Sequence, residues 1–196
     1  MRLNGVQRLL ETGLIISTFA AVFILCALVS FDPADPSWSQ TGYDNVRNIT
    51  GAAGAWIADI LLLTFGWLAY FVPAALQIFG YLLFKQPHRI FQLDYTTLSL
   101  RVIGFALFIT SATAISSINF DDIYNFSSGG VVGDVIASAM MPAFNFTGTS
   151  ILLLCFFFAG LTLLTGVSWV QCVDFIGDLI MRGYRFIAHQ LKAWLQ

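Results

Sequence analysis

The chain is poor in charge, in cysteine and in histidine. Only 10% of its 196 residues are Asp, Glu, Lys or Arg, while 58% are hydrophobic; soluble domains have about 25% and about 45–50%. The three cysteines, Cys26, Cys155 and Cys172, lie in or just after apolar stretches. The polar segments between those stretches therefore offer no disulfide framework. These deficits exclude a soluble globular domain and a disulfide-stabilised secreted one.

The residues that usually carry chemistry are also scarce. The two histidines, His88 and His189, are far apart, and neither an H-E-x-x-H nor a G-x-x-x-x-G-K-[ST] pattern occurs. Three nearby glycines, Gly129, Gly130 and Gly133, follow no strand and precede no lysine, so they do not predict a phosphate-binding loop. No run of Lys and Arg suggests a DNA-binding patch. We therefore expect a chain without catalysis, cofactor, metal site or nucleic-acid binding of its own.

Long apolar stretches are what the chain has instead. They cover about 12–31, 56–84, 98–118 and 149–171. Each supplies the roughly 20 residues that a helix needs to cross a bilayer, where only a helix or a closed barrel satisfies its backbone. The pattern predicts an all-α membrane protein with four transmembrane helices. The second stretch is too long for an upright span, and Pro73 is its expected bend point.

Basic residues are distributed very unevenly about these stretches. Eight of the nine lie before the first, between the second and third, at the start of the third, or after the fourth. Arg47, between the first and second, is the exception. The positive-inside rule then places both termini and the loop 85–97 in the cytoplasm, and the loops 32–55 and 119–148 outside. Because the loop 85–97 is short, we expect the second and third helices to pack as an antiparallel hairpin.

Two further helices are expected outside the spans. Ser127-Ser-Gly-Gly130 can cap a short helix over 131–141, which would lie at the membrane interface or re-enter the bilayer. In the segment 172–196, polar residues from Asp174 to Lys192 recur every three or four positions. That periodicity indicates an amphipathic cytoplasmic helix. It either lies on the anionic inner leaflet or simply continues the fourth span.

Small residues on two spans predict close helix packing. They are Gly104, Ser111 and Ala114 on the third span, and Ala159, Thr162 and Gly166 on the fourth. Such faces let helix backbones approach closely. They would serve either contacts within the bundle or contacts between subunits.

Several motifs together resemble one known family, the FtsK family of bacterial septal DNA translocases, in its N-terminal membrane domain. The similarity runs from about Arg8 to Tyr184. The motifs that carry it are Ser30-Phe-Asp-Pro-Ala-Asp-Pro-Ser-Trp-Ser-Gln40, Gly54-Ala-Trp-Ile-Ala-Asp59, Leu100-Arg-Val-Ile-Gly104, Ile118-Asn-Phe-Asp-Asp-Ile123, Ser128-Gly-Gly-Val-Val-Gly133, Gly160-Leu-Thr-Leu-Leu-Thr-Gly166 and Ser168-Trp169.

The resemblance implies a function that composition does not. Members of the family sit in the inner membrane at the division septum, where the four-helix domain supports assembly of the division machinery. A linker leads to a hexameric, ATP-driven motor that pumps DNA and aids chromosome-dimer resolution. This chain stops at Gln196, before any linker or motor, so it is expected to be a truncated piece or a natural short form without the ATPase.

The resemblance favours a non-catalytic membrane anchor and divisome scaffold. Its expected partners are the bilayer, other divisome membrane proteins and further copies of the chain, with no nucleic acid. The expected contact residues combine charge and aromatic character in the outward loops: Asp32, Asp35, Trp38, Asp121, Asp122 and Tyr124. Two alternatives stay open, a module that only oligomerises and a small four-helix transporter or channel.

Overall fold

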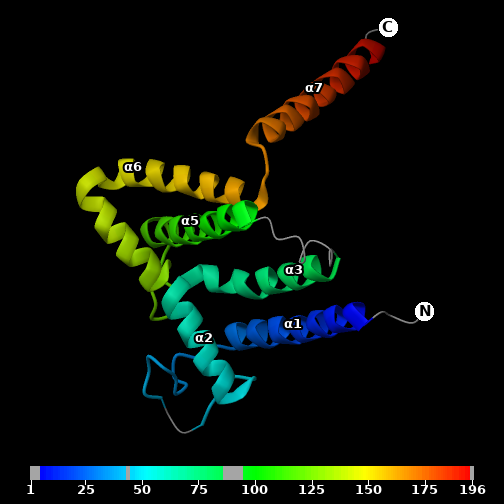
Figure 1. Ribbon diagram of the computed structural model, residues 1–196. Helices are drawn as coiled ribbons and strands as arrows, with labels where there is room; N and C mark the ends of the chain where they lie inside the picture. The colour runs from blue at the N-terminus through cyan, green and yellow to red at the C-terminus, as the bar shows by residue number, and fades with distance from the viewer. Residues whose placement is uncertain (1–4, 43–44, 86–94, 195–196) are drawn as a thin grey trace.

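A computed structural model describes residues 5–42, 45–85 and 95–194. The chain runs through α1 (Gly5–Val29), α2 (Gly51–Phe65), the 3₁₀ helix η1 (Gly66–Phe71) and α3 (Val72–Lys85) (Figure 1). It continues through α5 (Tyr95–Asn119), α6 (Gly130–Thr165) and α7 (Trp169–Trp194). Part of the expected cytoplasmic loop 85–97, including His88 and Arg89, lies outside the described residues.

The expected four-span membrane fold is confirmed. The described residues contain four segments long and apolar enough to cross a bilayer: Gln7–Val29, Gly51–Leu82, Tyr95–Asn119 and Gly130–Thr165. The second begins five residues before the expected start at 56. The fourth is continuous with the helix expected over 131–141. Many large apolar side chains on these helices, such as Phe19 and Phe71, remain exposed, as lipid-facing residues do.

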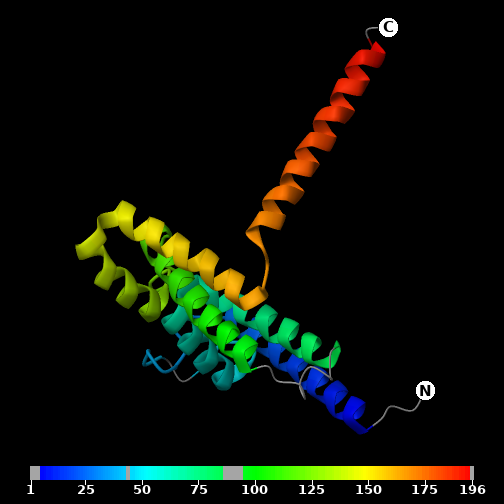
Figure 2. The ribbon, with the colours of Figure 1, turned by 45° about the horizontal axis from the view of Figure 1, so that its top comes forward.

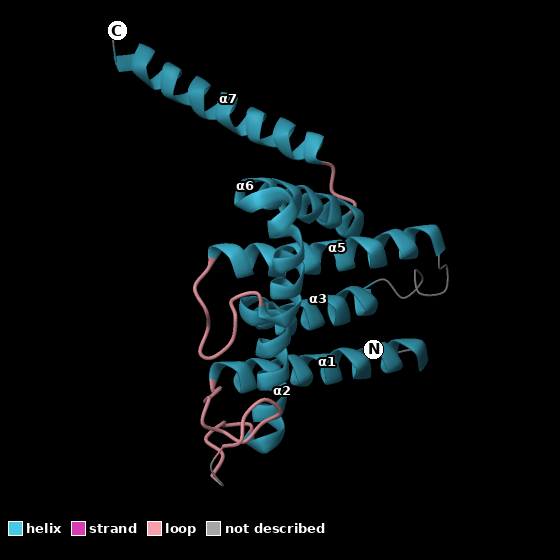
Figure 3. Ribbon diagram, turned by 90° about the vertical axis from the view of Figure 1, so that its left-hand side faces the viewer, coloured by secondary structure: helices cyan, strands magenta, loops and turns pink. Residues whose placement is uncertain are grey.

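The helices form two units of similar plan. In each unit a long helix (α1 or α5) leads to a loop, then to a helix that crosses the end of the stack (α2 or the start of α6), and then to a helix that returns beside the first (Figures 1 and 3). Thus α3 packs along α1, and α6 packs along α5. The expected antiparallel arrangement of the second and third spans is seen for α3 and α5, which run in opposite directions next to each other in the stack (Figures 1 and 3). Their main packing partners, however, are α1 and α6, each within its own unit.

The second span bends at Gly66 and not at Pro73. Gly66 ends α2 with φ 57° and ψ −129°, and η1 begins there. A side chain at Gly66 would place its Cβ 2.1 Å from the backbone oxygen of Ser128. Pro73 lies in the first turn of α3, where a missing N–H costs little because that donor has no partner within the helix. The prediction failed because the bend is set by a contact with a distant loop.

The fourth span bends as well, at Asn145. Helical turns of α6 lie on both sides of this residue, which itself has non-helical angles of φ 54° and ψ 179°. Pro142 lies three residues earlier within the same helix. The first part of α6 crosses the end of the bundle and the second part returns along α5 (Figure 1). The short helix expected over 131–141 is thus the first arm of a bent helix.

Glycines allow α5 and α6 to touch backbone to backbone. A Cβ at Gly104 would lie 2.9 Å from the oxygen of Gly160, and a Cβ at Gly160 would lie 2.6 Å from the nitrogen of Phe108. On α5 the expected residues Gly104, Ser111 and Ala114 are all buried. This crossing therefore lies within one chain.

The expected small face on the fourth span is wrong by about one residue. Ala159 is exposed and the neighbouring Gly160 is buried. Thr162 is half-buried, and its hydroxyl accepts a hydrogen bond from the Trp169 indole at 2.6 Å. Gly166 ends α6 in the left-handed conformation at φ 73°. One residue turns a helix face by about 100°, which explains why Gly160 and not Ala159 meets α5.

The C-terminal helix is separate from the fourth span. After Gly166, the residues Val167 and Ser168 are not helical, and the Val167 N–H donates to the Thr165 hydroxyl at 3.2 Å. The helix α7 then leaves the bundle in a new direction (Figure 2). The alternative that the fourth span simply continues is therefore wrong, because a left-handed glycine is a common helix stop.

Candidate partner interface at the loop end

Both long loops lie at the same end of the bundle, away from the N-terminus (Figure 3). We call the loop before α2 loop one (residues 30–50) and the loop before α6 loop two (residues 120–129). The side of the bundle that these loops cover is termed the loop end.

A buried carboxylate organises loop one. Asp35 is only 1% exposed. Its two oxygens accept the backbone N–H groups of Arg47 at 2.7 Å and Asn48 at 2.8 Å. The expectation that Asp35 lies on an exposed contact surface is therefore wrong. A buried carboxylate is stable only when its oxygens are satisfied, and here the chain 12–13 residues later satisfies them.

A second buried carboxylate ties loop one to α2. Asp59 is 0% exposed, and it accepts the Ser39 N–H at 2.8 Å and the Ser39 hydroxyl at 2.6 Å. From the sequence alone, Asp59 is only an acid near a helix end. The signal that could have found its role is an acid inside an otherwise apolar helix, which requires a polar partner from elsewhere. Hydrogen bonds to charged groups contribute about 1.5–3 kcal/mol each.

The third acid of this region, Asp32, is partly exposed. It accepts the Ala34 N–H at 2.9 Å and pairs with the Arg47 guanidinium at 3.1 Å. These two donors, the Ala34 N–H first, lower the pKa of Asp32 below its ordinary value of 3.8. Arg47 was the one basic residue expected in an outward loop, and its position beside Asp32 accounts for it. The pair is at the surface, where such bridges contribute little to stability.

Trp38 is the most exposed of the expected contact residues in loop one. Its side chain is 65% exposed, and its ring packs edge-on against Trp56 of α2 with centroids 6.1 Å apart. Asp35 and Asp59 fix the loop on both sides of Trp38. The indole is therefore held outward between two hydrogen-bonded points of the loop.

Loop two folds back through a tight turn. The backbones of Ile123 and Phe126 exchange two hydrogen bonds of 2.9 Å, and both side chains are buried. Tyr124 between them has φ 54° and is 50% exposed. The side chains of Asp121 and Asp122 are exposed. Asp122 accepts the Ser128 N–H at 3.2 Å, while the Asp121 carbonyl oxygen accepts the Trp67 indole at 3.1 Å.

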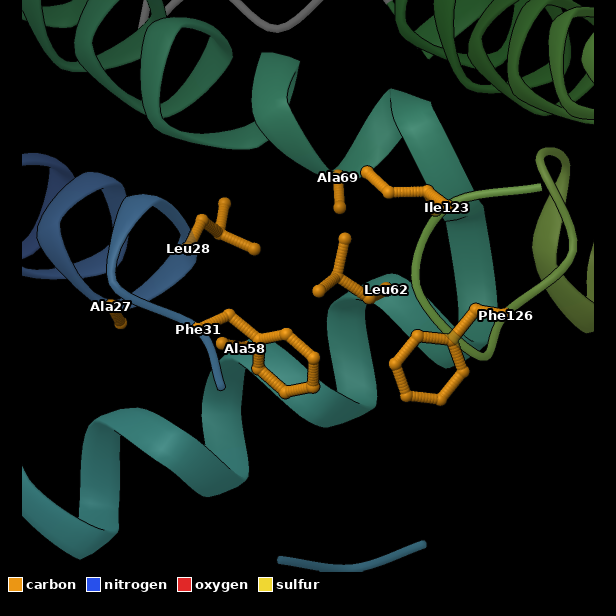
Figure 4. Packing of buried hydrophobic residues seen from close by; sticks show 8 residues of the cluster. All are labelled: Ala27, Leu28, Phe31, Ala58, Leu62, Ala69, Ile123 and Phe126. Atoms are coloured by element: carbon orange, nitrogen blue, oxygen red, sulfur yellow. The ribbon is translucent and has the colours of Figure 1, made fainter. Parts of the chain in front are cut away.

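An apolar core beneath the loops joins the two units. Phe31 at the end of α1 faces Phe126 of loop two, and Leu62 of α2 lies between α1 and loop two (Figure 4). The Phe31 ring also packs edge-on against Tyr124, with centroids 5.2 Å apart. The whole cluster is Ala27, Leu28, Phe31, Ala58, Leu62, Ala69, Ile123 and Phe126. Loop two is thus packed onto the first unit.

Ser128 adds a polar connection at the same place. It is fully buried, and it exchanges hydroxyl-to-carbonyl hydrogen bonds of 2.8 Å with Ser116 of α5. Its carbonyl oxygen also accepts the Trp67 N–H at 2.9 Å. Gly130, two residues later, lies against the backbone of Thr64, where a Cβ would come within 2.5 Å. The Ser128–Gly133 motif is therefore a close-packing element.

The structure thus separates the expected contact residues into two groups. Trp38, Asp121, Asp122 and Tyr124 are exposed, and Asp32 is half-exposed. Asp35 is buried. Sequence reasoning did not single out the exposed Phe120, Ile49 and Trp56, which are 63%, 73% and 44% exposed at this end. The loop end is therefore a surface of aromatic and acidic side chains, held in place by the buried carboxylates and the apolar core beneath it.

Comparison with known proteins identifies related chains. DNA translocase FtsK of Shewanella oneidensis is 53% identical over 89% of this chain, and that of Vibrio vulnificus is 43% identical over 97%. DNA translocase FtsK of Pseudomonas syringae pv. syringae is 32% identical over 95%. The chain spans only 19%, 20% and 24% of the length of these relatives. No solved structure matches the chain.

A family model described as the 4TM region of DNA translocase FtsK/SpoIIIE matches residues 6–177. The match contains all four membrane spans and both loops. The chain therefore belongs to this family, which is described as the 4TM region of DNA translocase FtsK/SpoIIIE.

Proposed function

We propose that this chain is the non-catalytic anchor of a septal DNA translocase in the bacterial inner membrane and a scaffold for other membrane proteins of division. Translocation and ATP hydrolysis are assigned to the parts of its relatives that the chain does not match. The chain covers about a fifth of those relatives, and this fifth consists of membrane helices.

Charge distribution supports the orientation in this proposal. Arg8 near the start of α1, Lys85 at the end of α3 and Arg101 near the start of α5 belong to the end opposite the loops. By the positive-inside rule that end faces the cytoplasm. The loop end then faces the periplasm, which places the aromatic and acidic surface outside and a cytoplasmic motor on the other side.

The architecture of the loop end is the observation that carries the scaffold role. Two buried carboxylates and an apolar core hold the loops in place, while Trp38 and Tyr124 stay exposed. Preordered surfaces lose less conformational entropy on binding, and Trp and Tyr are enriched at binding hot spots.

Complementation tests the proposal. The fluorescently tagged chain is expressed in cells depleted of their own septal translocase anchor, beside Trp38→Ala and Asp121→Asn variants. We expect the parent chain to localise at the septum and restore division. Both variants should reach the membrane at normal levels and restore division poorly. Phe19→Ala is the matched control, because Phe19 is 72% exposed on α1, away from the loop end.

Three outcomes would contradict the scaffold role. Uniform membrane fluorescence with filamentous cells would show that the chain acts only as a membrane anchor. Full division with both loop variants would show that partners bind a different surface of the chain. Septal localisation without restored division would favour the oligomerisation module. Ion or solute flux into liposomes above that of empty controls would instead support the transporter.

A further inference from the structure

Every side chain of the helix α7 that the structure describes is exposed. Its first residue contacts α6: the Trp169 ring packs against Phe158 with centroids 4.9 Å apart, and its indole bonds to Thr162. Further along, the large apolar side chains are each more than half exposed: Val173, Phe175, Ile176, Leu179, Ile180, Met181 and Tyr184. Exposed apolar area of this extent on an ordered helix indicates a surface that is covered in the working molecule.

The polar residues of α7 and most of its apolar residues occupy different sides. With 3.6 residues per turn, Asp174, Asp178, Arg182 and Arg185 fall within a sector of about 80°. Six of the seven large apolar residues fall across about 180° on the opposite side, and the seventh, Met181, lies beside Asp174. A two-stranded coiled coil uses a narrow seam of two apolar positions in seven. An apolar face as wide as this one is typical of a helix half-immersed at a membrane interface.

The connection to α6 keeps α7 beside the bilayer. Gly166, Val167 and Ser168 are the only residues between the end of a membrane span and the start of α7. Trp169 at the start of α7 is a residue type that prefers the interface. The left-handed Gly166 turns the chain away from the axis of α6. Because the tether is so short, the lipid surface is the partner that α7 meets at the highest local concentration.

We propose that α7 binds the surface of the anionic leaflet on which α6 ends, with Ile176, Ile180 and Tyr184 in the lipid. Arg182 and Arg185 lie on the polar sector, where a helix in this orientation keeps its charges at the headgroups. The two arginines supply attraction to acidic lipids, at about fivefold in binding per basic residue near the surface. This proposal needs the membrane spans but does not depend on the scaffold role.

Site-directed spin labelling of the full chain in vesicles tests it. Cys26, Cys155 and Cys172 are first replaced, and single cysteines are introduced at Ile176, Ile180, Asp178 or Arg182. Vesicles contain phosphatidylglycerol and phosphatidylethanolamine, with one chain per vesicle on average. Labels at 176 and 180 should be accessible to oxygen and protected from a water-soluble nickel chelate, and labels at 178 and 182 should show the reverse. A label at Phe19 is the lipid-exposed reference.

Charge variants test the lipid preference. Arg182→Gln with Arg185→Gln should lower the ratio of membrane-bound to free α7 about 25-fold at low salt, from about fivefold per residue. Asp174→Asn with Asp178→Asn is the matched control and should not lower that ratio. High salt should weaken binding of the parent chain more than that of the arginine variant.

Two results would overturn the proposal. Equal nickel accessibility at all four positions would place α7 in water. Protection of 176 and 180 from both reagents, with spin–spin broadening that disappears when chains are diluted in lipid, would show that a second copy covers the apolar face.

Discussion

The two units of this bundle fold back on themselves in the same way, but the bends that allow this are stabilised differently. In the first unit the bend after the crossing helix lies at Gly66, which is buried against loop two of the second unit. In the second unit the bend lies at Asn145, where residues 142–147 are all exposed. Both bends have a backbone with positive φ, 57° at Gly66 and 54° at Asn145.

The contrast shows two ways to fold a long apolar segment back. The bend at Gly66 is imposed by tertiary contact: Ser128 accepts the Trp67 N–H, and the close approach leaves no room for a side chain. At Asn145 the signals are local, since Pro142 interrupts the helix ladder and Asn tolerates positive φ better than most residues. Loop two of the second unit therefore stabilises the bend of the first unit. Among the residues that the structure describes, the exposed bend at Asn145 has no matching contact from the first unit.

The largest expected effect is at the supported bend. Gly66→Ala adds a Cβ 2.1 Å from the Ser128 oxygen, in a backbone region open essentially only to glycine. We expect a loss of about 3 kcal/mol or more, since clash adds to strain of about 1–3 kcal/mol. Reversible unfolding in mixed micelles, followed by circular dichroism, measures it. Gly177→Ala is the control, because a Cβ there meets nothing within 4 Å; equal stability of the two variants would contradict the account.

Replacing an acid should destabilise the chain more in loop one than in loop two. Asp35→Asn replaces one of two accepting oxygens by a donor that faces a backbone N–H, and its site is buried. The expected loss is about 2–3 kcal/mol. Asp122→Asn affects one longer bond at an exposed residue and should cost less than about 1 kcal/mol. Hydrogen exchange of the Arg47 and Asn48 amides gives the local readout. Comparable protection in both variants would show that Asp35 does not organise loop one.

The second unit should be most sensitive where its own helices cross. Gly160→Ala places a Cβ 2.6 Å from the Phe108 nitrogen, so α5 and α6 must separate, at a cost of about 1–3 kcal/mol. Ala159→Leu adds more volume one residue away but points to an exposed side, and it should change stability by about 0.5 kcal/mol or less. Unfolding in micelles distinguishes them. A larger loss for Ala159→Leu would restore the small face predicted from the sequence.

A substitution at the exposed bend should increase the stability of the chain. Asn145 has φ 54° and ψ 179°, a region in which a non-glycine residue carries strain of about 1–3 kcal/mol. Asn145→Gly removes that strain but adds chain entropy to the unfolded state, so we expect a net gain of about 1 kcal/mol or less. The same micelle unfolding measures it, with Asn119→Gly at the end of α5 as the control. Destabilisation would mean that the Asn145 side chain itself holds the bend.

The sequence predicted the features that depend on many residues at once. Hydropathy over about 20 positions marks a span wherever it packs, which is why the four spans and the amphipathic α7 were recognised. The exposed aromatic and acidic residues of the loops were recognised because their types are unusual in so apolar a chain.

The features that were missed depend on single distant contacts. The bend at Gly66 requires Ser128, which lies far along the chain in loop two and gives Gly66 no local signal. Asp35 appears as a solvated turn acid until Arg47 and Asn48 bring their N–H groups to it. On the fourth span, Ala159 and Gly160 are both small, and only the direction of α5 decides which one is buried.

The smallest expected effect concerns the exposed acid of loop one. The Ala34 N–H and Arg47 lower the pKa of Asp32 below 3.8, so the folded chain favours the carboxylate. Its small contribution to stability is therefore present above pH 3.8 and is lost as the pH falls through the lowered folded value. A carbon-13 carboxyl titration in nanodiscs should give a midpoint below 3.8. Arg47→Gln should raise that midpoint only part of the way, because the Ala34 N–H remains. Arg101→Gln, on the opposite end, should leave it unchanged, and an unchanged midpoint in Arg47→Gln would mean that the 3.1 Å pair does not persist in the bilayer.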